Sequence, residues 1–241
     1  LRRTVSDANG GAVSGASRFV PPGRSGGMTD VVIAGGGLAG LVAARHLADR
    51  GADVTLFEAR EDVGGRVRSR EVDGYTIDRG FQVLFTAYPA VQRELDLPAL
   101  DLRAFAPGAT IARADHRSTL ADPLRDPFSA VDSLLNPDVT ILDKLLTLKL
   151  RRRLGSGTTA GEFRGRGQSI RAYLDSWGFS DRYIENFVEP FYGGITLDRS
   201  LATDAGVFEY TFAMLSKGRT AVPADGMGAI PRQLAAKARD A

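Results

Sequence analysis

Three glycines and one glutamate are spaced for binding a dinucleotide. Gly35, Gly37 and Gly40 form the pattern G-x-G-x-x-G directly after the apolar residues 31–34. In this pattern the first glycine permits a tight turn, the second lets the backbone approach a pyrophosphate, and the third lets a helix pack closely on a strand. Glu58 follows the glycine pattern at a distance of about 20 residues. At this distance an acidic side chain can accept hydrogen bonds from both ribose hydroxyls. Its charge also disfavours NADP, because it repels a 2′-phosphate.

The surrounding sequence supplies the elements that position these residues. Residues 31–34 are mostly β-branched and suit a buried parallel strand. A helix is predicted over residues 38–50, ended by Gly51, and residues 52–58 form the second strand. The start of the helix offers N–H groups and a positive dipole end to phosphates. The predicted site therefore includes the first two residues of the helix, Leu38 and Ala39.

A second glycine-rich stretch follows the second strand. Gly64 and Gly65 can bring the backbone next to a phosphate, while Arg60 and Arg66 can donate paired hydrogen bonds to phosphate oxygens. The alternative is purely structural. Residues 71–77, EVDGYTI, also fit a plain β-hairpin, and Arg66 can pair with an acid on the surface.

Several segments together resemble a known family. EAR at 58–60 and VGGRVRS at 63–69 resemble the glycine-doublet signature of FAD-dependent amine oxidases, phytoene desaturases and protoporphyrinogen oxidases. YTIDRGFQVL at 75–84 is similar to the segment that reaches the flavin ring in that family. The stretches 178–198 and 222–235 resemble bacterial and archaeal amine-oxidase-like and phytoene-dehydrogenase-like proteins. The resemblance covers most of the chain after its first 27 residues.

This resemblance implies FAD as the cofactor. It places Glu58 at the adenosine ribose, Arg60 and Arg66 along the FAD, and Gln82 and Val83 near the flavin. A flavin can carry hydride chemistry while the protein supplies binding and orientation, so the cofactor rather than a side chain does the hard step. We therefore predict no catalytic residue.

Changes in pattern along the chain, together with what the resemblance implies, predict four segments. Residues 1–27 are rich in Gly, Ser, Pro and Arg and predict a disordered leader. Residues 28–97 form the first part of the FAD-binding domain, 98–217 a partial substrate domain, and 218–241 return toward the FAD-binding domain. The predicted fold class is α/β, with a Rossmann-type FAD-binding domain on a parallel sheet and an inserted, largely helical substrate domain that is incomplete. The family normally continues well beyond this point.

One long helix is predicted in the middle of the chain. Residues 136–155 begin with Asn136 as the cap, followed by Pro137 and Asp138, and end at Gly155. We expect its wide apolar face to belong to the core, and contact with a membrane surface is the less favoured alternative. The face consists of Leu142, Leu145, Leu146 and Leu150.

Three further helices are predicted after it. One ends at Gly178, the next starts at Ser180 and must stop before Pro190, and Asp204 can cap a third that runs to Gly218. Aromatic residues in these helices are expected mainly in the core, with an apolar substrate pocket over the flavin as the alternative. They are Trp177, Phe187, Phe191, Tyr192, Phe208 and Tyr210.

The bulk composition limits the chemistry. The chain has 241 residues and a formal net charge of +2, with scattered arginines that give no argument for nucleic acid. It has no cysteine, so disulfides, thiolate metal sites and cysteine nucleophiles are excluded and redox chemistry falls to a bound cofactor. Its two histidines, His46 and His116, have no predicted partners and are expected on the surface, so no metal site is predicted. We expect a cytoplasmic protein.

The sequence therefore predicts an FAD-dependent oxidoreductase. It oxidises a C–N or C–C bond of a small molecule and passes a hydride to FAD. The substrate is an amine, an isoprenoid or carotenoid, or a porphyrinogen-like compound, and the acceptor that reoxidises the flavin is unknown. Two alternatives stay open. A non-catalytic binding protein on the same fold, like the Rab GDP-dissociation inhibitors, is disfavoured by the glycine pattern with Glu58 and Arg66. An NAD-dependent dehydrogenase is disfavoured by the run from Gly64 to Arg66.

Overall fold

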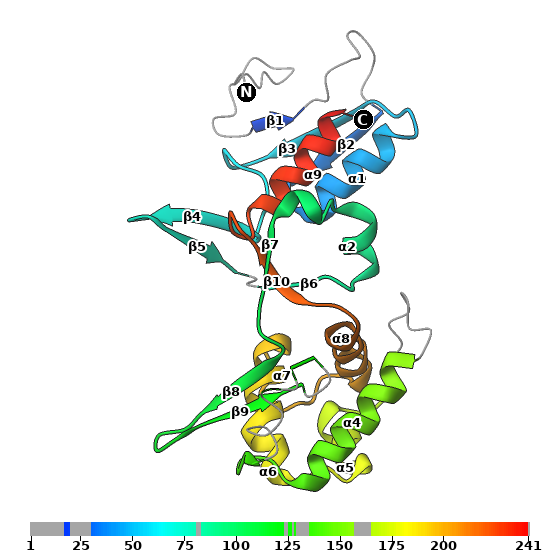
Figure 1. The fold of residues 1–241 in the computed structure, drawn as a ribbon. Helices are drawn as coiled ribbons and strands as arrows, with labels where there is room; N and C mark the ends of the chain where they lie inside the picture. Colours follow the sequence, from blue (N-terminus) through cyan, green and yellow to red (C-terminus); the bar gives the residue numbers. More distant parts are fainter. Residues whose placement is uncertain are drawn as a thin grey trace. The chain divides into compact units, whose positions relative to one another are not determined.

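The chain is α/β, as predicted, and divides into two compact units (Figure 1). The structure, a computed structural model, describes residues 17–19, 30–80, 83–122, 125–126, 128, 135–156 and 165–240. Unit 1 comprises the described residues of Leu1–Leu84, Ala90–Arg103 and Ala221–Ala241, and unit 2 those of Phe85–Pro89 and Ala104–Thr220. The domain limits inferred from the sequence, at 97/98 and 217/218, stay a prediction.

Unit 1 contains the predicted strand–helix–strand element. It consists of β2 (Val31–Ala34), α1 (Leu38–Ala48) and β3 (Val54–Glu58). β2 and β3 pair in parallel, which confirms the predicted pairing. α1 ends at Ala48, two residues before the predicted end at residue 50, and Gly51 follows it with a φ of +88°, a conformation that favours glycine.

A third strand joins this sheet from an unexpected place. β1 (Ser17–Phe19) pairs antiparallel with β3, so that the strand order is β1-β3-β2. The sequence predicts disorder throughout residues 1–27 and a purely parallel sheet, and both expectations are wrong for these three residues. The physical reason is that the outer edge of β3 presents N–H and C=O groups, which a neighbouring strand can pair.

Two further sheets include residues of unit 1. β4 (Arg68–Val72) and β5 (Tyr75–Arg79) form a hairpin, whose turn residues Asp73 and Gly74 both have positive φ. β6 (Leu84–Phe85), β10 (Thr220–Pro223) and β7 (Leu102–Ala104) form a sheet in that order, and the limits of the two units fall within these strands. The remaining helices around unit 1 are α2 (Pro89–Glu94), η1 (Pro98–Leu100) and α9 (Ala229–Asp240).

The apolar core of unit 1 lies between its sheet and two helices. α1 and α9 lie side by side against the β2–β3 pair (Figure 1). Leu41 and Ala44 of α1, Leu56 of β3, and Leu234 and Ala238 of α9 are all buried in this core. Burial of these side chains stabilises the framework on which the first glycine turn is built.

Unit 2 is mostly helical. The predicted helix limits at Gly178 and Asp204 are confirmed, because Gly178 has a φ of +84° and Asp204 accepts a hydrogen bond from the Gly206 amide at 2.7 Å. Its elements are β8 (Gly108–Ala112), β9 (Arg117–Ala121), α4 (Ile141–Ser156), α5 (Ile170–Trp177), α6 (Asp181–Tyr183), η2 (Ile184–Val188), α7 (Glu189–Thr196) and α8 (Ala205–Lys217).

The predicted limits of α4 are wrong. The helix begins at Ile141 rather than directly after Asn136, and Gly155 lies inside it. Thr140 and Asp143 form a reciprocal cap: the Asp143 amide donates to Thr140 Oγ1 at 3.1 Å, and the Thr140 amide donates to Asp143 Oδ2 at 3.1 Å. This capping box satisfies two amides at the start of the helix and fixes its first turn.

The apolar face of α4 is shared between core and surface. Leu150 and Leu154 are buried, whereas the side chains of Leu142 and Leu145 are 59% and 60% exposed. α4 is therefore a core helix only on the face that carries Leu150 and Leu154. Contact of the face with Leu142 and Leu145 with a membrane stays a prediction. Among the described helices, none is both long enough and apolar enough to cross a bilayer.

The chain stays helical through Pro190, contrary to the prediction. α6, the π-helical segment η2 and α7 follow one another without a break, and Pro190 lies in the first turn of α7. α-Helical hydrogen bonding starts again with α7 after the π-helical turn, and proline is tolerated in the first turn of an α-helix. The π-helical turn before it shifts the hydrogen-bonding pattern at this point.

Candidate cofactor-binding site

The first glycine turn lies between β2 and α1. Gly35 has a φ of +101°, a conformation that favours glycine. A Cβ on Gly40 would lie 2.1 Å from the Gly35 carbonyl oxygen, so only glycine lets α1 start this close to the turn. In the described part of the chain, a Cβ on Gly37 would meet no atom within 4 Å apart from those of Gly37 and its two neighbours. The geometry thus matches a tight turn, a close helix packing and an open approach to the backbone.

The start of α1 is suited to an anion. Gly37 is the N-cap residue and provides no side-chain hydrogen bond to the helix. Leu38 is half-buried and Ala39 is exposed, so the first residues of α1 are partly open to solvent. The first amides of a helix have no partner within the helix, and together with the helix dipole they attract phosphate groups.

Glu58 stands at the end of β3 beside this turn. Its Oε2 accepts a hydrogen bond from the Gly36 amide at 2.8 Å, and its Oε1 accepts one from the Arg60 amide at 3.1 Å. The carboxylate is therefore held at the glycine turn by two backbone donors. This is the place at which an acidic residue binds the ribose of a dinucleotide.

The second glycine stretch lies directly against the first. The Gly64 amide donates to the Gly36 carbonyl oxygen at 2.8 Å, and Gly64 pairs with Gly37 as an isolated parallel bridge. Gly64 and Gly65 have φ values of +122° and +60°. A Cβ on Gly65 would lie 3.3 Å from Cα of Gly37. The two stretches thus form one surface made of backbone, which we call the glycine cradle (residues 35–40, 64 and 65).

Two arginines flank the glycine cradle. Arg60 is exposed, and its Nη1 lies 3.5 Å from the Gly65 carbonyl oxygen. Arg66 is also exposed, and its side chain makes no hydrogen bond or ion pair with another residue in the described part of the chain. The alternative in which Arg66 serves a surface acid is therefore not what the structure shows. Both guanidinium groups are accessible to a phosphate.

The residues expected near the flavin are described only in part. Gln82 lies outside the described residues, and Val83 is half-buried directly before β6. Their contact with a flavin stays a prediction. Gly80, at the end of β5, packs against the second glycine stretch, because a Cβ there would lie 2.7 Å from the Arg66 carbonyl oxygen.

Gly36 is a site residue that the sequence analysis missed. Its amide binds Glu58 and its carbonyl oxygen binds the Gly64 amide, so it connects the acid to both glycine stretches. A Cβ on Gly36 would lie 3.1 Å from the Val63 side chain and 3.2 Å from Glu58 Oε2. The run of three consecutive glycines is a signal that could have indicated this crowding.

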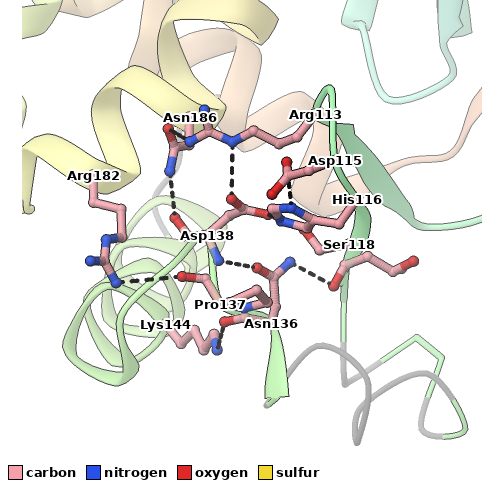
Figure 2. Close-up of polar contacts among 11 residues, drawn as sticks. Arg113, Asp115, His116, Ser118, Asn136, Pro137, Asp138, Lys144, Arg182 and Asn186 are labelled. Carbon is pink, nitrogen blue, oxygen red and sulfur yellow. Dashed lines mark hydrogen bonds and ion pairs between the residues drawn. The ribbon is translucent and has the colours of Figure 1, made fainter.

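The expectation that the two histidines lack partners is wrong. In unit 1, His46 Nε2 lies 3.1 Å from Glu94 Oε1. In unit 2, His116 lies between two carboxylates, with Nδ1 3.0 Å from Asp115 Oδ1 and Nε2 3.1 Å from Asp138 Oδ2 (Figure 2). Two of these carboxylate partners, Glu94 and Asp138, are buried. Each is distant in sequence from its histidine, so the spacing of the residues could not reveal the contact.

Glu94 ties three helices of unit 1 together. Its buried carboxylate lies 2.7 Å from Arg45 Nη2 and 2.6 Å from Arg93 Nε, and its carbonyl oxygen accepts a hydrogen bond from Lys237 Nζ at 2.9 Å. Burial alone would raise the pKa of Glu94, but hydrogen bonds from His46 and Arg93 and the charge of Arg45 hold it below its usual value. The cluster links α1, α2 and α9, so its role is structural.

Asp138 is the centre of a polar cluster in unit 2 (Figure 2). Its carboxylate is 5% exposed and accepts hydrogen bonds from Ser118 Oγ, His116 Nε2 and Arg113 Nε, the last at 3.2 Å. Burial alone would raise the pKa of Asp138, but these three hydrogen bonds together lower it. The Asn186 side chain donates to the Asp138 carbonyl oxygen at 3.2 Å. The cluster therefore ties the β8–β9 hairpin to the segment before α4 and to η2.

Raising the pH is expected to loosen this cluster. The hydrogen bonds of His116 with Asp138 and Asp115 raise the pKa of its imidazole. A raised folded-state pKa means that the stabilisation is complete below the unfolded value of about 6.5 and is lost as the pH rises through the folded value. Thermal denaturation from about pH 6 to about pH 9 should show wild type losing stability relative to His116→Gln. If the stability difference between wild type and His116→Gln does not change with pH, the stabilising role of protonated His116 is contradicted.

Comparison with known proteins identifies a family that matches most of the chain. Residues 38–241 match the family described as flavin containing amine oxidoreductase. The carotenoid 3,4-desaturase of Haloarcula japonica is 55% identical over 51 residues, which cover 21% of this chain and 10% of that protein. The chloroplastic/chromoplastic 15-cis-phytoene desaturase of Arabidopsis thaliana is 40% identical over 93 residues, or 38% of this chain and 16% of that protein.

A solved structure shows the same fold. An oxidoreductase from Methanosarcina mazei aligns with a TM-score of 0.60 at 21% identity, over 87% of this chain and 49% of the other. The chain thus spans about half the length of that protein and smaller parts of the two desaturases. Because the family match extends over most of its length, the chain belongs to the flavin-containing amine oxidoreductases.

Proposed function

We propose that this protein is an FAD-dependent oxidoreductase. The observation that carries the proposal is the glycine cradle, in which Gly64 binds Gly36 and a Cβ on Gly37 would face open space. A surface of backbone with an open approach suits a pyrophosphate, because no side chain blocks close contact. Membership of a flavin-containing family supports FAD as the dinucleotide.

Each site residue has one task in this proposal. Glu58 holds the adenosine ribose, and the start of α1 holds the pyrophosphate. Arg60 and Arg66 offset the charge of the phosphates, and Gln82 and Val83 lie near the flavin. When bound, FAD would accept the hydride from a C–H bond as the adjoining C–N or C–C bond is oxidised to a double bond. We assign no catalytic residue.

The proposed substrate is a small apolar or amine-bearing molecule. The two desaturase relatives favour an isoprenoid or carotenoid, and the family name favours an amine, while a porphyrinogen-like compound is the third class. In unit 2 the rings of Tyr192 and Phe208 are buried and 4.5 Å apart, and Phe191 is 37% exposed. Such an aromatic cluster supports an apolar pocket, although it serves equally as core. The cytoplasmic location stays a prediction.

The first experiment is an absorbance spectrum of the full-length protein. Flavin bands, with about one FAD per chain released by acid, would support the proposal. Bleaching of those bands in the absence of oxygen would then identify the substrate among amines, carotenoids and porphyrinogens. A colourless, folded protein that takes up no added FAD would overturn the proposal and leave a binding role in its place.

Replacing Arg66 with alanine is expected to weaken FAD binding about tenfold, because one charge-assisted contact with a phosphate is lost from an exposed position. Arg70→Ala is the matched control, since Arg70 is another exposed arginine, on β4. Titration of the two apoproteins with FAD, followed by flavin fluorescence, measures the difference. Equal affinities for the two variants would remove Arg66 from the site.

The two alternatives have less support. A binding protein without a cofactor needs neither the open position at Gly37 nor the accessible guanidinium of Arg66. An NAD-dependent dehydrogenase needs the first glycine turn but not the second glycine stretch that packs against it.

A further inference from the structure

We propose that Ser69 and Asp78 are positioning residues for the cofactor loop, defined as residues 64–66, and this inference rests on the proposed function. The two residues face each other in register on the β4–β5 hairpin. Ser69 Oγ donates a hydrogen bond to Asp78 Oδ1 at 2.5 Å. Neither residue belongs to the glycine cradle, so any effect on the cofactor must pass through other residues.

The pair binds the backbone of a turn that is far away in sequence. The Met227 amide donates to Asp78 Oδ1 at 2.8 Å, and the Gly228 amide donates to Ser69 Oγ at 2.7 Å. Gly226 has a φ of +74°, and a Cβ there would lie 2.5 Å from Ser69 Oγ. Two hydrogen bonds and one contact that only glycine allows therefore fix this turn on the hairpin.

The start of α9 connects this turn to the cofactor loop. The helix starts at Ala229, directly after the turn, and Pro231 lies in its first turn. A Cβ built on Gly64 would lie 2.9 Å from Cγ of Pro231, so the proline packs against the glycine. One continuous segment, residues 226–231, thus contacts both Gly64 in the loop and Ser69 just after it.

The position of the cofactor loop depends on this bracing. The Gly64 amide must reach the Gly36 carbonyl oxygen to close the glycine cradle. If the Gly228 amide loses its acceptor, the start of α9 is no longer held on the hairpin, and Pro231 no longer fixes Gly64. At metal sites, mutating a residue that orients a ligand without touching the metal typically costs about tenfold to hundredfold in affinity, and we expect a loss of similar size here.

The test uses the full-length protein with Ser69 variants. Ser69→Ala is expected to weaken FAD binding about tenfold to hundredfold and to change the visible circular dichroism of the bound flavin. Ser69→Thr keeps the hydroxyl and should restore both. Glu71→Ala is the control, because Glu71 is exposed on the same strand, and it should leave both unchanged. Wild-type affinity in Ser69→Ala would overturn the proposal.

Amide hydrogen exchange of the apoprotein provides a measurement that needs no FAD. In Ser69→Ala we expect faster exchange at Gly64 as well as at Gly228, with unit 2 unchanged. Unchanged exchange at Gly64 would overturn the positioning role even if FAD bound normally to wild type. If wild type binds no FAD, the proposed function fails, while exchange at Gly64 still decides the role of Ser69. If Ser69→Ala does not fold, Asp78→Ala replaces it. This variant removes the acceptor of the Met227 amide, and the same results for FAD affinity and for exchange at Gly64 support or overturn the proposal.

Discussion

Replacing Gly37 with alanine is expected to weaken FAD binding strongly while the protein stays folded. Beyond Gly37 and its two neighbours, a Cβ at this position would meet no atom of the described residues within 4 Å, and the φ of −72° is open to any residue. The added methyl would occupy the space that the proposal gives to the pyrophosphate, where the backbone must come close. We expect affinity to fall about hundredfold or more, equivalent to about 2.7 kcal/mol, with an unchanged melting temperature of the apoprotein.

Gly40→Ala is the matched comparison and should behave differently. Its Cβ would lie 2.1 Å from the Gly35 carbonyl oxygen, so the backbone of the turn itself must move. Both the apoprotein's stability and its FAD binding should then fall. Flavin absorbance after reconstitution and thermal denaturation of the apoproteins separate the two variants. Wild-type affinity in Gly37→Ala would show that no phosphate lies at the glycine cradle.

The sequence predicted best where each requirement was local. The β2–α1–β3 unit follows from an apolar strand, a turn that needs a positive φ at Gly35, and a helix that needs no side chain at Gly40. All three signals lie within a short stretch of chain, and each has a single structural solution. The same holds for Gly178 and Asp204, which end and begin their helices by contacts with nearby backbone.

The sequence predicted poorly where residues far apart in the chain compete for the same group. Asn136 and Asp138 carry a good helix-start signal, yet Asp138 is bound by the hairpin residues Arg113 and Ser118. Because the buried carboxylate is held there, the helix starts later, at the capping box of Thr140 and Asp143. That second signal was readable in the sequence, but nothing local indicates which of the two signals tertiary contacts select.

In the candidate site, too, the local features were predictable from the sequence and the contacts between distant residues were not. Spacing and resemblance indicated the two glycine stretches, and the structure adds that they pack on each other through Gly36 and Gly64. The contact of Pro231 with Gly64 joins residues that are far apart in the chain. Spacing along one sequence carries no information about such a contact, because it depends on where α9 packs.

Replacing Asp138 with alanine is expected to destabilise unit 2 by about 2 to 3 kcal/mol. Its carboxylate is 5% exposed, and its removal leaves the buried Ser118 hydroxyl without its acceptor. Complete loss of a buried charge partner costs about 3 to 5 kcal/mol. The expected loss is smaller here because the Arg113 and His116 side chains are 43% and 37% exposed and can turn to water.

Asp115→Ala provides the control for this experiment. Asp115 binds the same imidazole, but its side chain is 82% exposed, so its removal should leave stability almost unchanged. Urea denaturation followed by fluorescence reports on unit 2, because Trp177, the only tryptophan of the chain, lies there. Asp138→Asn keeps an acceptor oxygen and should lose less than Asp138→Ala. Equal losses in Asp138→Ala and Asp115→Ala would mean that the histidine, rather than the buried carboxylate, holds the hairpin in place.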